Sequence, residues 1–160
     1  YVLIASMART PDLKTAPKGE LRRLIEDRSF GNQTLDGEVE RSIKIFKILA
    51  SPSAEIDEEK FRKEVIKNFN RSSNTEGFSR QLIAILADKD RYDEVQTIAT
   101  PTLVIHGKLD PLIPYEEGKK TAELMPNSEF LSVDFMSHLI DKPVLDYIET
   151  PMVKFLDKNS

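Results

Sequence analysis

A short apolar segment closed by a glycine constrains the possible folds of this chain more than any other feature. Residues 102–106 read Thr-Leu-Val-Ile-His, and Gly107 follows directly. A β-branched, apolar run of this length that ends in glycine is typical of a buried strand entering a turn. The segment therefore predicts a sheet with at least one strand inside the protein.

Further segments predict strands that alternate with helices. Residues 2–5 and 130–133 are short apolar runs of the kind that form buried strands. Residues 115–125 are expected to form a helix, and residues 143–156 a terminal helix that Pro151 interrupts. Strands that alternate with helices indicate an α/β fold with a parallel sheet and right-handed crossovers.

The block between the first two strands has a helical pattern instead. Apolar residues recur there at helical spacing in three groups: Val39, Ile43, Phe46 and Leu49; Phe61, Val65 and Phe69; and Phe78, Leu82 and Leu86. Three amphipathic helices are therefore expected between residues 19 and 88, with Asp57 placed to cap the second. We expect the block from Pro11 to Tyr92 to be a helical insertion after the first strand.

Composition argues against several classes of function. The 160 residues carry a formal charge of −4 at pH 7, and their lysines and arginines are spread along the chain, so nucleic acid is not an expected partner. There is no cysteine, and the two histidines, His106 and His138, are too few for a histidine-rich metal site. No apolar run approaches the roughly 20 residues that span a bilayer. We expect a cytoplasmic protein that binds no metal, cofactor or membrane.

The beginning of the chain also carries information. The first residue is a tyrosine rather than a methionine, and an apolar run starts with it directly. A strand that begins at the first residue has no segment leading into it. We therefore expect further sequence to precede Tyr1, with a trimmed natural terminus as the alternative.

Two residues with catalytic chemistry follow two of the predicted strands. Asp110 lies three residues after Gly107, and His138 lies in the loop after the strand at 130–133. The C-terminal ends of parallel strands meet at one edge of a sheet, where ligands and reactive side chains gather. A carboxylate bound to one imidazole nitrogen orients the ring and leaves the other nitrogen able to take a proton from a nucleophile. His106, which ends a strand, is instead expected to be a packed, hydrogen-bonded residue outside the site.

The order of apolar strand, Gly-x-x-Asp-Pro turn, helix, strand and histidine loop resembles the end of the α/β-hydrolase superfamily. The resemblance covers residues 92–156 and implies that Asp110 is the acid and His138 the base of a catalytic triad. A carboxylate oxygen of Asp110 is then expected about 2.6 to 3.2 Å from a ring nitrogen of His138. It also implies that the three strands are the last three of a hydrolase sheet and that the helical block is a cap, or lid. The implied domains are residues 1–10, a strand of the hydrolase core; residues 11–92, the cap; and residues 93–160, the C-terminal part of the core.

Two details refine this resemblance. The superfamily usually has glycine before the catalytic histidine, whereas this chain has Ser137, which disfavours a positive φ. Residues 71–81 and the pair Asp90-Arg91 resemble the methylesterase-like hydrolases related to aclacinomycin methylesterase. The finer resemblance implies an ester as substrate.

The nucleophile implied by the resemblance is missing from this sequence. The superfamily places it in a Gly-x-Ser-x-Gly elbow between a strand and a helix, in the chain order nucleophile, acid, base. The sequence has no such motif, and the nearest, Gly77-Phe78-Ser79, lacks the second glycine and lies within a helical pattern. We interpret Ser79 as a residue in the first turn of a cap helix. The chain is then a part of a hydrolase that lacks both the nucleophile and the oxyanion hole.

The expected function of the parent protein is hydrolysis of a small-molecule carboxylic ester or related acyl bond. Two alternatives stay open. One is an aspartate nucleophile with the same acid and base, as in dehalogenases and epoxide hydrolases, and the other is a non-catalytic binding or signalling protein on the same scaffold. The strand at residues 2–5 is expected to be a bare edge, which pairs either with the missing N-terminal half or with another copy of the chain.

Overall fold

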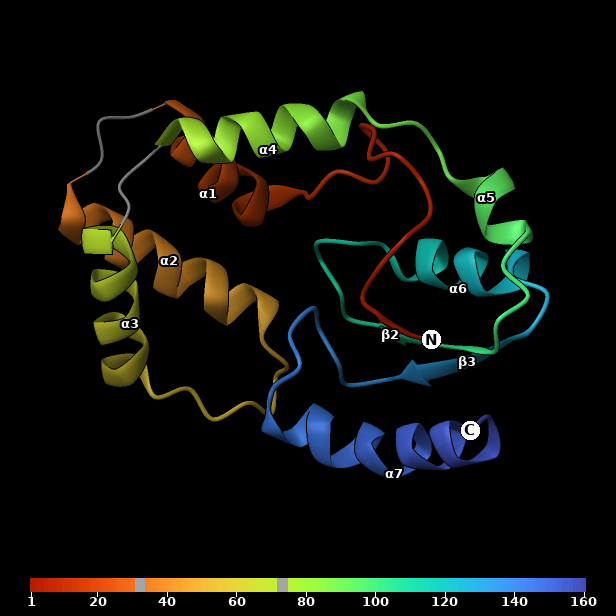
Figure 1. Ribbon diagram of the computed structural model, residues 1–160. Helices are drawn as coiled ribbons and strands as arrows, with labels where there is room; N and C mark the ends of the chain where they lie inside the picture. Colours follow the sequence, from red (N-terminus) through yellow and green to blue (C-terminus); the bar gives the residue numbers. More distant parts are fainter. Residues whose placement is uncertain (31–33, 72–74) are drawn as a thin grey trace.

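The computed structural model describes residues 1–30, 34–71 and 75–160, and at residues 27–30, 75, 76, 78 and 79 it describes the backbone alone (Figure 1). Three parallel strands form one sheet in the order β1-β2-β3, so β2 is central and β1 lies at an edge. The predicted alternation of strands and helices is confirmed. The elements of this part are β1 (Val2–Ile4), β2 (Thr102–Gly107), α6 (Tyr115–Leu124), β3 (Ser128–Val133) and α7 (Lys142–Lys158).

The central strand β2 is buried along its whole length because a helix covers each face of the sheet. Alternate side chains of a strand point to opposite faces. On one face Ile105 belongs to a core cluster with Ile148 of α7, and on the other Val104 belongs to a cluster with Ala122 of α6. Figure 1 shows α6 and α7 on opposite sides of the strands. This layering covers both faces of the sheet and leaves the ends of the strands open to a ligand.

Helix α7 runs unbroken through Pro151, contrary to the interruption predicted from the sequence. A proline inside a helix leaves the carbonyl four residues earlier without its donor, at a cost of about 3 kcal/mol. That carbonyl belongs to Tyr147, which is half exposed and can bind water instead. Val144, Ile148 and Phe155 are buried on either side of the proline. Their burial keeps both halves of the helix on the sheet.

The block between β1 and β2 contains four longer helices and one short helix in its described part, where the sequence predicts three. The additional long helix is α1, in which half of the residues are charged, so that its apolar period is weak. Asp57 caps α3 as predicted, since its Oδ1 accepts the backbone N–H of Lys60 at 2.9 Å. The helices are α1 (Gly19–Phe30), α2 (Leu35–Leu49), α3 (Glu58–Arg71), α4 (Thr75–Ala87) and α5 (Tyr92–Gln96).

No strand occurs among the described residues between 11 and 92, so the helical character predicted for this block is confirmed. Figure 1 shows α1 to α4 gathered beyond the C-terminal ends of β2 and β3. The polar residues 71–74 predict a connecting loop, of which residues 72–74 lie outside the described residues, and the domain boundaries stay a prediction. None of the described helices is both long and apolar enough to cross a membrane.

Candidate active site

Asp110 is held by the backbone of its own turn. It lies just after β2, and its side chain is fully buried. Its Oδ1 accepts the backbone N–H of Leu112 at 2.8 Å and that of Ile113 at 2.9 Å. Hydrogen bonds from backbone N–H groups to a carboxylate are charge-assisted, so they both stabilise the charge and fix the orientation of the group. The second oxygen, Oδ2, remains to face the histidine loop.

That oxygen contacts His138, as the sequence predicts. Asp110 Oδ2 lies 2.9 Å from His138 Nδ1, so the predicted hydrogen-bond distance is confirmed. A carboxylate oxygen accepts, and therefore Nδ1 carries the proton and Nε2 presents a lone pair. The His138 side chain is 21% exposed, and its Nε2 makes no hydrogen bond to the described residues. The pair thus offers a nitrogen that can accept a proton from a group placed beside it.

Gly107 allows two segments to meet: the turn at residues 107–113, called the acid turn, and the loop at residues 134–138, called the histidine loop. A Cβ at this position would lie only 2.2 Å from the carbonyl oxygen of Met136, a distance that no side chain tolerates. The backbone N–H of Leu109 donates to that same oxygen at 3.1 Å. Backbone contact at a position that only glycine can occupy therefore sets the separation of acid and base.

An ion pair between Lys108 and Asp134 spans the same two loops, with 2.7 Å between Nζ and Oδ1. The hydrogen bond to Asp134 raises the pKa of Lys108. Both side chains are exposed, at 49% and 78%, and exposed pairs of this kind contribute about 0 to 1 kcal/mol. The close backbone contact at Gly107, rather than this pair, positions the loops.

The histidine loop is also bound to the end of α2. The backbone N–H groups of His138 and Leu139 both donate to the carbonyl of Leu49 at 3.0 Å, and Ser137 Oγ donates to the carbonyl of Ile48 at 3.3 Å. The last carbonyls of a helix have no donor within the helix, which leaves them available to a neighbouring loop. The imidazole is therefore positioned by the sheet and by the helical block together.

The serine before the histidine fits this loop. Among the described residues other than glycine, only Ala5 has a positive φ, so Ser137 adopts a backbone conformation that serine tolerates. The departure from the superfamily pattern thus leaves the loop geometry intact. The link to α2 was not predicted, because no pattern in the sequence marks which loop binds the end of a helix.

His106 is buried and hydrogen-bonded, as interpreted from the sequence. Its side chain is fully buried, and Nε2 lies 3.1 Å from the carbonyl oxygen of Ile113. The same nitrogen lies 3.5 Å from Asp110 Oδ2, a proximity that was not predicted. The signal available in the sequence was the spacing of four residues between His106 and Asp110 across the turn.

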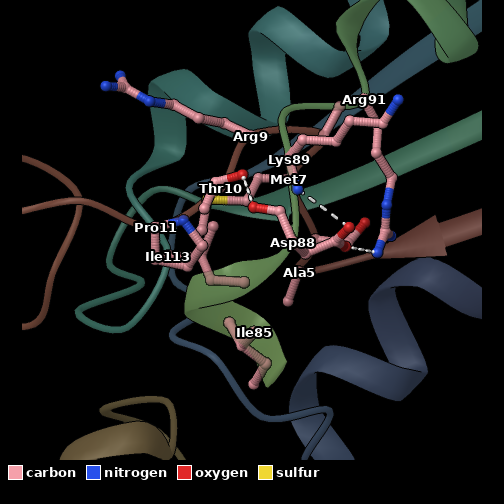
Figure 2. Close-up of a pocket in the computed structure, with 12 residues that line it drawn as sticks. Ala5, Met7, Arg9, Thr10, Pro11, Ile85, Asp88, Lys89, Arg91 and Ile113 are labelled. Atoms are coloured by element: carbon pink, nitrogen blue, oxygen red, sulfur yellow. Dashed lines mark hydrogen bonds and ion pairs between the residues drawn. The ribbon is translucent and has the colours of Figure 1, made fainter. Parts of the chain in front are cut away.

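A cavity of about 280 Å³ opens beside the acid turn, between the segment after β1 and the end of α4 (Figure 2). Ile85 and Ile113 contribute apolar surface to it. Thr10 Oγ1 donates to the carbonyl of Asp88 at 2.8 Å, which ties the two walls together, and Arg91 pairs with the carboxylate of Asp88. The cavity therefore combines apolar surface with charged side chains, of which Arg91 and Asp88 pair with each other.

The described residues provide no support for a nucleophile in this chain. Ser79 lies in α4, with helices on either side of it in the chain rather than a strand before it, and its side chain is outside the described residues. Within the described part of the chain, no three acidic or histidine side chains are grouped so that they could hold a metal ion. The described site consists of the carboxylate of Asp110 and the imidazole of His138.

Solved hydrolase structures match nearly the whole chain. A meta-cleavage product hydrolase (CumD) from Pseudomonas fluorescens matches 99% of this chain and 56% of its own, with a TM-score of 0.71 at 16% identity. An esterase from Thermogutta terrifontis matches 99% of this chain and 56% of its own, with a TM-score of 0.67 at 22% identity. At these identities the matches establish the fold, which is about half of an α/β-hydrolase.

Sequence comparisons agree with this fold. The family model described as TAP-like protein matches residues 86–159. The putative carbamate hydrolase RutD of Agrobacterium fabrum is 34% identical over 74 residues, which are 46% of this chain and 28% of that protein. A pimeloyl (acyl-carrier protein) methyl ester esterase of Vibrio cholerae is 38% identical over 56 residues, which are 35% of this chain and 22% of that protein. The chain spans about a quarter of the length of these relatives, so the sequence similarity, like the match to the family model, covers a part of the chain.

Proposed function

We propose that this chain supplies the acid and the base of a serine hydrolase that cleaves a carboxylic ester or a related acyl bond. The contact of 2.9 Å between His138 Nδ1 and Asp110 Oδ2 supports the proposal most directly. His138 Nε2 takes the proton of a serine hydroxyl as that oxygen attacks the acyl carbon, and then gives the proton to the leaving alcohol. Asp110 holds the ring in the required tautomer and stabilises the imidazolium that forms.

The nucleophile and the oxyanion hole belong, in this proposal, to sequence outside these 160 residues. In the superfamily the nucleophile precedes the acid and the base along the chain, in a Gly-x-Ser-x-Gly elbow. The present sequence has no such motif, and it corresponds to only 56% of the solved hydrolase that it matches with a TM-score of 0.71. The elbow is therefore expected on the N-terminal side of Tyr1.

The proposed substrate is an alkyl ester of a carboxylic acid. One relative is named a methyl ester esterase, and another, from Acinetobacter calcoaceticus, a bifunctional esterase/perhydrolase. The resemblance of residues 71–81 and of Asp90-Arg91 to methylesterase-like hydrolases points to the same class. The apolar surface of the cavity beside the acid turn suits the alkyl or acyl part of such a substrate. The helical block at residues 11–92 is proposed to cover this site as a cap.

A comparison of this chain with the complete protein tests the proposal. The chain alone should hydrolyse an activated aryl ester no faster than its His138→Ala variant, because a base activates only a hydroxyl that is present. The complete protein should hydrolyse the ester, and His138→Ala should lower its turnover by a factor on the order of 10⁶. A fluorophosphonate should label one serine of the elbow.

Ser79→Ala serves as the control, since it should leave the turnover of the complete protein unchanged. Labelling of Ser79 in the isolated chain would refute the proposal that the nucleophile of the triad lies outside these 160 residues. An aspartate in the elbow, with turnover of haloalkanes or epoxides instead of esters, would replace the serine mechanism. A complete protein that binds esters but neither cleaves them nor reacts with the label would show a binding protein.

A further inference from the structure

The second histidine of the chain lies against the residue proposed as the triad acid. His106 Nε2 is 3.1 Å from the carbonyl oxygen of Ile113 and 3.5 Å from Asp110 Oδ2. The other ring nitrogen, Nδ1, is buried and has no hydrogen-bond partner among the described residues. Asp110 Oδ2 therefore has a nitrogen of each histidine near it, one from His106 and one from His138.

These surroundings decide which nitrogen of His106 carries the proton. A carbonyl oxygen only accepts, so the contact with Ile113 requires an N–H at Nε2. On the other side of the ring, α6 packs directly against Nδ1, because a Cβ at Gly118 would lie 2.0 Å from that atom. A proton on Nδ1 would be buried without an acceptor, which is unfavourable. The neutral ring with its proton on Nε2 is the form that fits.

The Nε2–H of His106 links to Asp110 through Ile113, which makes hydrogen bonds to both residues. Ile113 donates its N–H to Asp110 Oδ1 at 2.9 Å and accepts from His106 through its carbonyl. His106 Nε2 also lies 3.5 Å from Asp110 Oδ2, a distance at which the contact is electrostatic rather than a full hydrogen bond. Both oxygens of the carboxylate are thus oriented by groups that depend on His106.

The ring of His106 is itself fixed. Tyr115 packs edge-on against it, with ring centroids 6.3 Å apart. The hydroxyl of Tyr115 donates to Ser132 Oγ at 3.0 Å, which ties the aromatic ring to β3. Together with the contact at Gly118, this packing leaves the imidazole little room to rotate.

We propose that His106 is a positioning residue for Asp110, whose Nε2–H holds the acid turn so that Oδ2 faces His138 Nδ1. The proposal rests on the function proposed above for Asp110 and His138. A purely structural role would make His106 matter for folding but not for the hydrogen bond between acid and base. The two roles therefore differ in an observable of His138.

Imidazole NMR measures that observable, because the chain has only two histidines. In protein labelled with ¹⁵N-histidine, His106 should show its proton on Nε2, and His138 should show a low-field Nδ1–H proton bound to Asp110. A nuclear Overhauser contact between these two protons is expected, since both approach Asp110 Oδ2. His106 found with its proton on Nδ1, or absence of the Overhauser contact, would overturn the proposal without any variant.

Two substitutions extend the test. His106→Leu keeps an apolar side chain and removes the donor, whereas His106→Gln keeps an amide N–H near the position of Nε2. The low-field resonance of His138 should be lost in the folded Leu variant and restored in the Gln variant. An unchanged resonance in folded His106→Leu would show a structural role only. If His106→Leu does not fold, the wild-type spectrum above still decides.

Turnover of the complete protein separates this proposal from the proposed function. His106→Leu should lower kcat by about 10- to 100-fold through misplacement of the acid, with His106→Gln recovering most of it. If the complete protein shows no hydrolysis but the resonance responds as expected, the proposed function fails and the positioning role stands. If hydrolysis is present and His106→Leu changes neither kcat nor the resonance, the positioning role fails.

Discussion

At the scale of single residues, the two oxygens of Asp110 have different partners. Replacement of this carboxylate by the isosteric amide of asparagine should therefore disturb its contact with His138. Oδ1 accepts two backbone N–H groups, while Oδ2 faces His138. An asparagine here would place its oxygen where Oδ1 lies, because the backbone donors require an acceptor. Its NH₂ group would then point at His138 Nδ1 and force the ring proton onto Nε2, the nitrogen that must accept a proton.

Asp110→Asn should therefore lower kcat of the complete protein on the order of 10⁴-fold while the protein stays folded. The measurement is steady-state hydrolysis of an aryl ester, with circular dichroism as the check on folding. Asp134→Asn is the matched control, since it removes an exposed carboxylate from the next strand end and should change the rate less than about twofold. Equal losses in both variants would contradict the tautomer argument.

The sequence predicts the positions of acid and base but not all that holds them. Asp110 and His138 follow from local patterns, since each comes just after a strand whose apolar run can be recognised. The contact of His106 with Asp110 depends on how the turn folds back. The bonds from the histidine loop to Leu49 join segments 89 positions or more apart in the chain, as the neighbouring Ser137 to Ile48 contact shows. Contacts between distant segments produce no periodic pattern in the sequence of either segment, so they cannot be predicted from it.

At the scale of secondary-structure elements, α6 acts as a wall behind the site. Gly118 lets this helix approach the ring of His106, and the ring is fully buried and cannot move aside easily. A methyl group here would overlap the ring. Helix α1 and the continuity of α7 at Pro151 show the limit of prediction at this scale, because packing rather than local periodicity determines both.

Gly118→Ala should destabilise the protein by about 1 to 3 kcal/mol, in spite of the better helix propensity of alanine. The midpoint of urea unfolding measures the change. Gly77→Ala in α4 is the matched control, since a Cβ there would contact nothing within 4 Å. This second substitution should stabilise the protein by about 0.5 to 1 kcal/mol. The two substitutions should change the free energy of unfolding in opposite directions, and stabilisation by both would show that the contact with His106 is unimportant.

At the scale of the whole molecule, β1 is an edge strand whose side away from β2 pairs with no described strand. The N–H of Ala5 donates to Ile105, and the carbonyl of Tyr1 accepts from Leu103, so the odd-numbered residues of this segment face β2. Because bonding alternates along a parallel strand, the N–H of Val2 points away from β2. An unpaired row of this kind can pair with another chain.

The isolated chain is therefore expected to associate with itself or with a segment that supplies the missing neighbour of β1. Sedimentation velocity over a wide concentration range should show association for the wild type. Val2→Pro removes an outward N–H without disturbing the pairs with β2 and should weaken it. Val2→Thr keeps both the N–H and the β-branched shape and should not. A wild-type chain that stays monomeric at every concentration would refute the expectation.

The pairing of β1 with β2 also has a kinetic consequence. Tyr1 bonds to Pro101 across 100 positions of the chain, whereas Asp110 and His138 are only 28 positions apart. The entropy lost on closing a loop grows with its length, and contacts between distant segments form late for that reason. The unit of β2, α6 and β3 can therefore assemble around the acid and base first. When the complete chain refolds, β1 has to wait until the helical block between it and β2 has folded, so its side of β2 stays open longest.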